Sequence, residues 1–233
     1  IAEVNQTQQT LIVELEQVNL VYRKLRIQAK PTPAQLQRLE ASSETLAKLS
    51  AEIGALPAPP EAAALRRELV KLLDVQLAIA DEVTGLVRYL PLEAAAQRQF
   101  AAATRRLRRD IMAARTAAAQ DAAFTAFRDE LLPIVSRLVR AKAPAVVEPS
   151  RVAEIARLRA LVKIAEQIRL ALVERRMKDV EALFAHFART SAATGTTPAE
   201  RAAIVAFNRR LDAIVDQRQR LSKERVRLEN ELG

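Results

Sequence analysis

The scarcity of glycine is the feature that most constrains this fold. Only 4 of the 233 residues are glycine, while strong helix formers such as alanine, leucine, arginine, glutamate and glutamine dominate the chain. Glycine and proline are the residues that most often end helices, so long stretches without them favour long helices. No segment alternates apolar and polar residues between turn residues, as a strand would. The sequence therefore predicts an all-α protein.

Apolar residues recur in steps of three and four in two parts of the chain, from Val4 to Leu25 and from Ile204 to Leu232. This spacing is typical of the packing seam of coiled coils. We expect an elongated antiparallel bundle of about seven helices, arranged as repeated long helical hairpins with spectrin-like or coiled-coil-like packing. The expected helices span about residues 1–30, 33–53, 61–90, 92–118, 121–142, 150–190 and 197–232.

Proline-bearing connectors divide these helices into groups. We expect one hairpin over residues 1–56, a second hairpin with an additional helix kinked at Pro133 over residues 61–142, and a long third hairpin over residues 150–233. Together they would form one continuous helical domain or two closely packed subdomains.

Two helix starts share the same capping pattern, which suggests an internal repeat. Thr32-Pro33-Ala34-Gln35 and Thr197-Pro198-Ala199-Glu200 each place threonine at the N-cap, proline at the first helical position and an acid or amide at the third. The residues around Pro91 do not decide locally between a chain reversal and a kink. The repeat, extended to the middle of the chain, favours a reversal at Pro91.

Residues for catalysis and metal binding are scarce. The chain has no cysteine, which removes disulfides, thiolate catalysis and cysteine metal sites. Its single histidine, His186, follows Asp179 by seven residues, so the pair could orient a proton carrier; we expect instead that His186 packs beside its phenylalanine neighbours. Glycine-rich phosphate loops and metal-binding helix motifs are absent. We expect no enzymatic activity, no cofactor and no metal.

A cluster of arginines is the most prominent charged feature. Residues 98–115 contain six arginines and one aspartate. The candidate anion-binding or partner-binding residues are Arg98, Arg105, Arg106, Arg108 and Arg109. Exposed and unpaired, they could bind phosphates of nucleic acid, lipid or a wall polymer. Alternatively, Arg98, Arg105 and Arg109 pair with acids of neighbouring helices, such as Glu82 or Glu130, and this second outcome is the one we expect.

Two further arginines occupy apolar positions of the last seam. Arg218 and Arg225 fall where the three-and-four spacing calls for a buried residue. A polar residue in such a seam commonly sets register or the choice of partner. We therefore treat both as candidate partner or register residues.

These observations favour a non-enzymatic helical scaffold or interaction protein. The 29 arginines against 8 lysines indicate a GC-rich bacterial genome, and the start at Ile1 rather than methionine suggests an exported, envelope-attached protein, with a cytoplasmic one as the alternative. The expected partner is another protein or a second copy; an anionic polymer or lipid surface is the alternative, and nucleic acid is not expected. No stretch is long and apolar enough to be a transmembrane segment.

Overall fold

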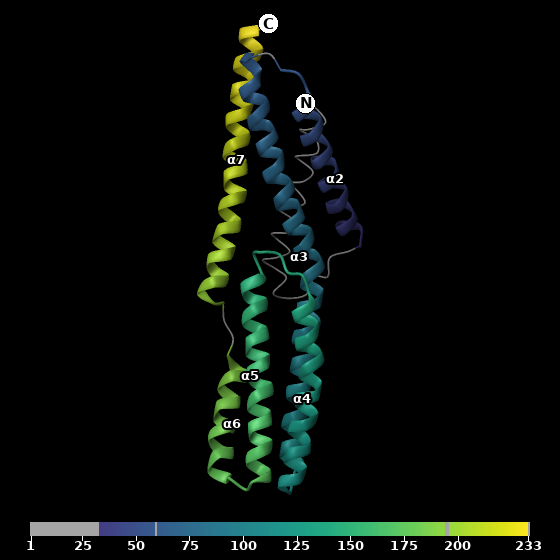
Figure 1. Cartoon of the computed structure of the whole chain (residues 1–233), viewed down its shortest axis with the longest axis vertical. Coiled ribbons are helices and arrows are strands. Elements are labelled where there is room, and N and C mark those ends of the chain that lie inside the picture. The colour runs from purple at the N-terminus through teal and green to yellow at the C-terminus, as the bar shows by residue number, and fades with distance from the viewer. Residues whose placement is uncertain (1–32, 59, 194–195, 233) are drawn as a thin grey trace. The chain divides into compact units, whose positions relative to one another are not determined.

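The computed structural model describes residues 33–58, 60–193 and 196–232, and these residues form helices without any strand (Figure 1). The all-α prediction is therefore confirmed for the described part of the chain. The seven-helix count and the hairpin repeat are not confirmed, and the seam from Val4 to Leu25 and the Thr32 cap lie outside the described residues. The helices are α2 (Pro33–Ala55), α3 (Pro60–Ala113), α4 (Ala117–Arg140), α5 (Glu148–Val173), α6 (Met177–Ala192) and α7 (Pro198–Leu232).

Local capping explains where two of these helices begin. At α7 the Glu200 amide donates to the Thr197 hydroxyl at 3.1 Å, and the Thr197 amide donates to the Glu200 carboxylate at 3.3 Å. This reciprocal pair is the predicted capping box, with Pro198 as the first helical residue. At α4 the Thr116 hydroxyl accepts from the Ala119 amide at 3.1 Å. In both cases a threonine satisfies an amide that the first helical turn leaves unpaired.

The predicted reversal at Pro91 is wrong, because α3 continues through it. Pro91 lies inside a helix of 54 residues, and its side chain is exposed. An interior proline removes one backbone hydrogen bond and costs about 3 kcal/mol in an isolated helix. Buried residues on both sides of it, including Tyr89 and Ala96, supply packing that holds the helix together. Pro133 is likewise an exposed residue inside α4.

The expected single helix over residues 150–190 is also wrong, because the chain turns at residues 174–176. The Arg176 amide donates to the Ala171 carbonyl at 2.9 Å, and the Arg175 amide donates to the Leu172 carbonyl at 3.2 Å. These two bonds define a Schellman C-cap, whose left-handed position glycine usually fills. Here Arg175 fills it, with φ of 57°. The turn therefore carries no glycine or proline signal in the sequence.

The described chain divides into two compact units, and the first contains residues 1–88 and 202–233. In it α2 runs antiparallel to the first part of α3, since Ser50 donates to Asp74 at 2.6 Å while Arg88 pairs with Glu40. On α7, the residues of the predicted three-and-four spacing whose burial the structure describes are buried or half-buried. They are Ile204, Phe207, Leu211, Ile214, Arg218, Leu221 and Arg225.

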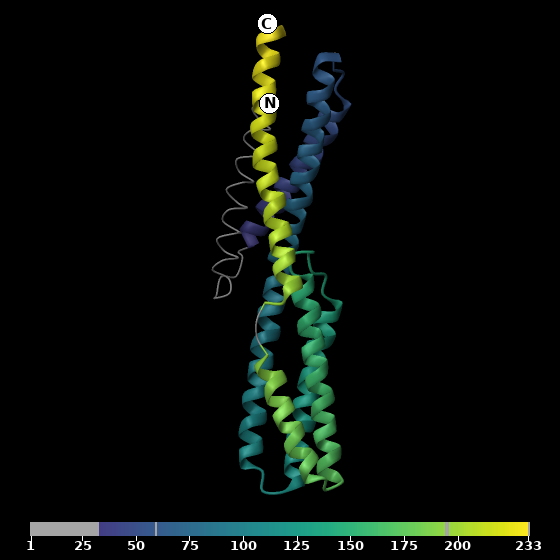
Figure 2. The same ribbon diagram turned by 90° about the vertical axis from the view of Figure 1, so that its left-hand side faces the viewer.

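The second unit, residues 89–201, is an antiparallel four-helix bundle of the second part of α3 with α4, α5 and α6 (Figure 2). Adjacent helices are linked by Arg106 to Glu130, Arg169 to Asp121 and Arg157 to the Ser191 carbonyl. A single apolar core joins all four helices. Its aromatic centre consists of edge-to-face contacts of Phe124 with Phe184 and Phe187, whose ring centroids lie 5.3 and 5.9 Å away.

We predict that Arg175→Gly stabilises the protein by about 0.5–1 kcal/mol. A side chain in the left-handed region is strained by its Cβ, and the relief exceeds the extra freedom that glycine gives the unfolded chain. Arg175→Ala keeps the Cβ and serves as the control, with no comparable gain. The measurement is urea unfolding of the three proteins, and a glycine variant no more stable than the alanine variant would contradict the prediction.

Candidate functional site: an arginine face of the second unit

Nearly all of the net charge belongs to the second unit. Residues 89–201 contain 20 arginines and lysines against 12 aspartates and glutamates, a net charge of +8 out of +9 for the chain. The first unit has 17 against 16, a net charge of +1. The electric field of this excess positive charge attracts anions to the second unit.

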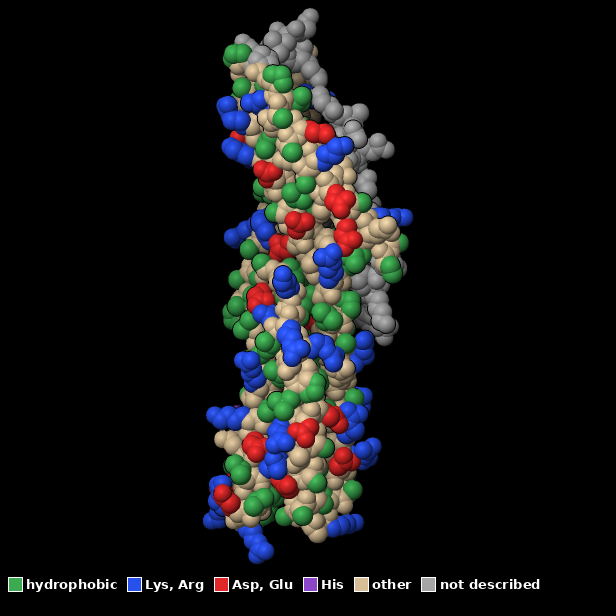
Figure 3. Space-filling model, turned by 45° about the vertical axis from the view of Figure 1, so that its right-hand side comes forward, with side chains coloured by type: hydrophobic (Ala, Val, Ile, Leu, Met, Phe, Trp, Pro, Cys, Tyr) green, Lys and Arg blue, Asp and Glu red, His purple; other side chains and the backbone are tan. Residues whose placement is uncertain are grey.

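Most acids of the second unit already have an arginine partner. Nine of the twelve pair with seven arginines, which leaves thirteen basic side chains without an ion pair among the described residues. Over the surface drawn in Figure 3, acidic and basic side chains accordingly lie next to one another. The pairs are Arg106–Glu130, Arg109–Asp110, Arg128–Asp129, Arg128–Glu166, Arg151–Glu148, Arg157–Glu154, Arg169–Asp121, Arg169–Glu166, Arg176–Glu174 and Arg176–Asp179.

The predicted arginine cluster lies on α3 and divides into two kinds of residue. Arg106 donates to both oxygens of Glu130 on α4, with its Nε 2.8 Å from Oε1. Arg109 contacts only its neighbour Asp110, with its Nε 3.0 Å from Oδ1. The other three are exposed and have no ionic or hydrogen-bond partner within the described ranges. They are Arg98, Arg105 and Arg108.

The expectation that Arg98, Arg105 and Arg109 pair with Glu82 or Glu130 is therefore wrong. Glu130 faces Arg106, which points towards α4 and away from the outer side of α3. Glu82 belongs to the first unit and pairs with Arg210. On a helix, residues seven apart lie nearly above one another, so Arg98 and Arg105 share the outer side of α3 with Arg109. We call Arg98, Arg105, Arg108 and Arg109 the arginine face.

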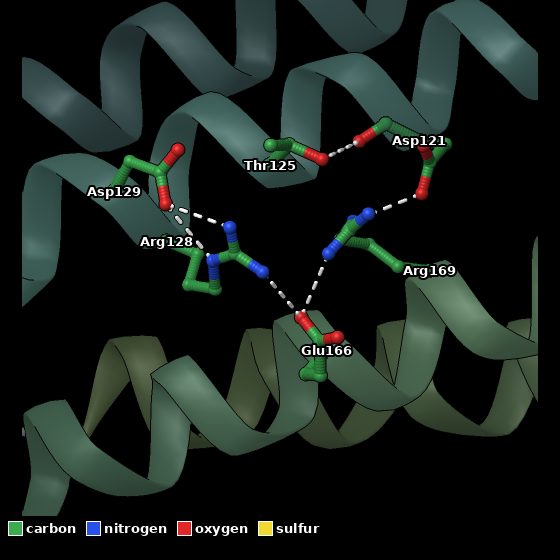
Figure 4. Close-up of polar contacts among 6 residues, drawn as sticks. All are labelled: Asp121, Thr125, Arg128, Asp129, Glu166 and Arg169. Carbon is green, nitrogen blue, oxygen red and sulfur yellow. Dashed lines mark hydrogen bonds and ion pairs between the residues drawn. The ribbon is translucent and has the colours of Figure 1, made fainter.

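An ion-pair network between α4 and α5 shows what the paired arginines do (Figure 4). Arg128 of α4 and Arg169 of α5 both contact the same Glu166 oxygen, at 3.0 and 2.9 Å. Each also keeps a second acid, Asp129 for Arg128 and Asp121 for Arg169. Burial alone would raise the pKa of Glu166, but the two arginine hydrogen bonds outweigh it and lower the pKa. These arginines join helices and are occupied.

Three acids of this unit, Glu93 on α3, Glu154 on α5 and Glu200 at the start of α7, interact through their charges. Burial raises the pKa of Glu93, and the charges of Glu200 and Glu154 raise it further. Burial also raises the pKa of the Tyr89 hydroxyl, and the charge of Glu93 adds to that shift. Sequence patterns missed this cluster because its acids come from three separate helices.

The other candidate residues form no catalytic or metal arrangement in the described chain. His186 is exposed rather than packed, and Asp179 pairs with Arg176 instead of orienting it. Within the described ranges no three histidine, aspartate or glutamate side chains are grouped to hold a metal ion. No helix there is long and apolar enough to cross a membrane. Arg218 and Arg225 are half-buried residues of α7 in the first unit.

We predict that Glu166→Gln destabilises the protein by about 1 kcal/mol. Arg128 and Arg169 lose a shared partner but keep Asp129 and Asp121, so the loss stays close to that of one exposed ionic hydrogen bond. Glu181→Gln is the matched control, because Glu181 is exposed and unpaired among the described residues, and should change stability by less than about 0.5 kcal/mol. Urea unfolding at neutral pH measures both, and equal effects would contradict the role given to Glu166.

We predict the opposite sign for Glu93→Gln, which should stabilise the protein at neutral pH. A raised pKa means that the folded protein binds the Glu93 proton more tightly than the unfolded chain does. The charged Glu93 carboxylate therefore destabilises the folded protein increasingly as pH rises from the pKa of the unfolded chain through the higher pKa of the folded protein. Below both pKa values the carboxyl group is protonated in both states, and this destabilisation is absent. Unfolding free energies of parent and variant should converge in acid and diverge towards neutral pH. A difference that is constant with pH would contradict this assignment.

Comparison with known proteins does not add a family to these features. No protein-family model, curated protein or solved structure matches the chain. The function is therefore inferred from the charges, burial and contacts of the described residues.

Proposed function

We propose that this chain is a non-enzymatic helical interaction protein that binds an anionic ligand through the arginine face of α3. The observation that supports this proposal is the exposure of Arg98, Arg105 and Arg108 without acid partners among the described residues. They stand in a unit where nine of twelve acids are already paired. We keep the bacterial cell envelope as the setting of the proposal, since lipid headgroups and wall polymers there are anionic.

Free arginines favour binding over a purely structural role for energetic reasons. An arginine that already holds a carboxylate must give up that partner before it can bind a phosphate. Within the described part of the chain, Arg98, Arg105 and Arg108 have no such contact to lose, whereas Arg106 has two hydrogen bonds to Glu130. Each free guanidinium can offer a bidentate pair of donors to a phosphate.

The rigid position of the face supports the same function. The opposite side of this part of α3 is buried in the four-helix core through Ala96, Ala103 and Leu107. The arginines are therefore carried by a helix whose orientation is fixed by packing, and they need no folding step before binding. From Arg98 to Arg109 the helix extends about 16 Å, the length of several phosphate groups in a polymer or on a surface.

We predict salt-dependent binding that requires the free arginines. The probes are a DNA duplex, tested by electrophoretic shift, and vesicles of phosphatidylcholine and phosphatidylglycerol in equal parts, tested by flotation. With three phosphates engaged on DNA, affinity should fall about fortyfold between about 50 and 200 mM salt. Arg105→Gln should weaken binding to the preferred probe by several-fold, because it removes a free contact.

Arg106→Gln is the matched control for this prediction. It removes the same charge from the neighbouring position, but its side chain is already held by Glu130. It should therefore weaken binding less than Arg105→Gln does. Failure to bind either probe, or an equal effect of the two substitutions, would contradict the proposed function.

A further inference from the structure

One end of the four-helix bundle brings together two turns that are far apart in the sequence. The turn from α3 to α4 covers residues 114–116, and the turn from α5 to α6 covers residues 174–176. Asp121, in the first turns of α4, and Arg169, in the last turns of α5, are 2.9 Å apart at their closest charged atoms. Both turns therefore lie at the same end of the second unit, which we call the turn end (Figures 1 and 2).

The turn end carries the most exposed large apolar side chains of the described residues. Met112, at the end of α3, is 76% exposed, and Val173, at the end of α5, is 71% exposed. Met177, at the start of α6, is 57% exposed. Single exposed apolar residues are ordinary on protein surfaces, but a group of them at one end of a domain indicates a contact surface.

The basic residues around these apolar side chains are not neutralised. Arg108, Arg115, Arg175 and Lys178 are exposed and have no ionic partner in the described parts of the chain. The acids nearby are already occupied, since Arg109 holds Asp110, Arg169 holds Asp121, and Arg176 holds both Glu174 and Asp179. Glu181 is the remaining exposed acid without a partner on this part of the described chain. The turn end is therefore both apolar and positively charged.

We propose that the turn end docks on the surface of an anionic lipid bilayer. Met112, Val173 and Met177 enter the headgroup layer, while Arg108, Arg115, Arg175 and Lys178 contact lipid phosphates. Exposed apolar groups surrounded by basic ones match a bilayer surface, which offers an apolar phase beneath a layer of negative charge. This inference goes beyond the proposed function, because it places a bilayer contact at the turn end, which shares Arg108 with the arginine face.

A bilayer fits these side chains better than a nucleic acid does. Nucleic acids take aliphatic side chains poorly and are bound mainly through phosphates and through stacking on exposed aromatic rings. The tyrosine and phenylalanine rings of this unit are buried or half-buried, and four of the phenylalanines pack against one another. Met112 and Val173 would remain in water on a nucleic acid, so their exposure would contribute nothing to its binding.

In end-on docking, only those arginines of the arginine face that lie close to the turn end can interact with the headgroup layer. Met112 lies 14 residues beyond Arg98 on α3, which is about 21 Å along the helix axis. The Debye length at physiological salt is about 8 Å, so a headgroup layer that reaches Met112 is screened from Arg98. Arg108 lies about 6 Å from Met112 along the axis and stays within range. Bilayer docking at the turn end therefore uses Arg108 but not Arg98.

The experiment measures partitioning of the full chain onto vesicles of phosphatidylcholine and phosphatidylglycerol in equal parts at physiological salt. Arg108→Gln combined with Arg115→Gln should weaken partitioning roughly twentyfold to thirtyfold, at about fivefold for each charge. Met112→Ser combined with Val173→Ser should weaken it at least about tenfold, because two aliphatic side chains no longer leave water. Vesicles of phosphatidylcholine alone should bind weakly.

Two matched controls separate the turn end from the rest of the unit. Arg159→Gln removes an exposed arginine of α5 that has no ionic partner in the described chain and lies 14 residues, about 21 Å, before Val173. Val152→Ser removes a 53% exposed valine near the start of α5, at the opposite end of the bundle. Each should change partitioning by less than about twofold. All substituted side chains are exposed, and circular dichroism melting confirms that the variants fold alike.

Several results would overturn the bilayer inference. If Arg98→Gln weakens partitioning as much as Arg108→Gln does, the protein binds side-on by electrostatics, and only the proposed function remains. The same conclusion follows if Met112→Ser combined with Val173→Ser leaves partitioning unchanged. Binding of a DNA duplex without vesicle binding would do the same. Self-association that depends on Met112, without vesicle binding, would assign the turn end to a second copy. Failure to bind any of these anions would remove the proposed function as well.

Discussion

The continuity of α3 through Pro91 is the constraint on which both units depend. Its first part supplies Leu72, Leu73 and Ile79 to the core of one unit, and its second part supplies Ala103 and Leu107 to the other. Pro91 has no N–H to bond to the Val87 carbonyl, and its ring is exposed to solvent. Apolar burial on either side then outweighs the cost of about 3 kcal/mol that proline imposes in an interior turn.

Arginine has two separate roles in the second unit, and the position of the acids decides between them. Arg128 and Arg169 are enclosed by acids from two helices and serve as links between those helices. Arg98 and Arg105 have the same side chain on the outer side of α3, where no acid reaches them within the described chain. The unit is held together by one set of arginines and charged by the other. Composition alone assigns both sets the same +1 charges and cannot distinguish them.

Features that depend on neighbouring residues in the chain could be predicted from the sequence. The Thr197 capping box was predictable because Glu200 lies three residues away, and the burial of Phe207 and Ile214 was predictable because the apolar spacing repeats along α7. The turn at Arg175 could not be predicted, because Glu174, Arg175 and Arg176 are good helix formers. Only tertiary packing stabilises a chain reversal at these residues. The turn end was hidden for the same reason, since a straight helix over residues 150–190 places Val173 in mid-helix. The raised pKa of Glu93 depends on burial and on charges from two other helices, and it has no local signal in the sequence.

The division of the chain has a consequence for the order of folding. The four-helix bundle is one continuous segment, residues 89–201, with each helix packed against its neighbour in sequence. Such local contacts allow fast folding that needs nothing outside the segment. The other unit is discontinuous and combines residues 1–88 with residues 202–233. During synthesis from the N-terminus, the bundle can close while α7 is still being made. The partner helices of α3 in the first unit are complete only when the ribosome reaches the end of α7, so this unit is the last to form.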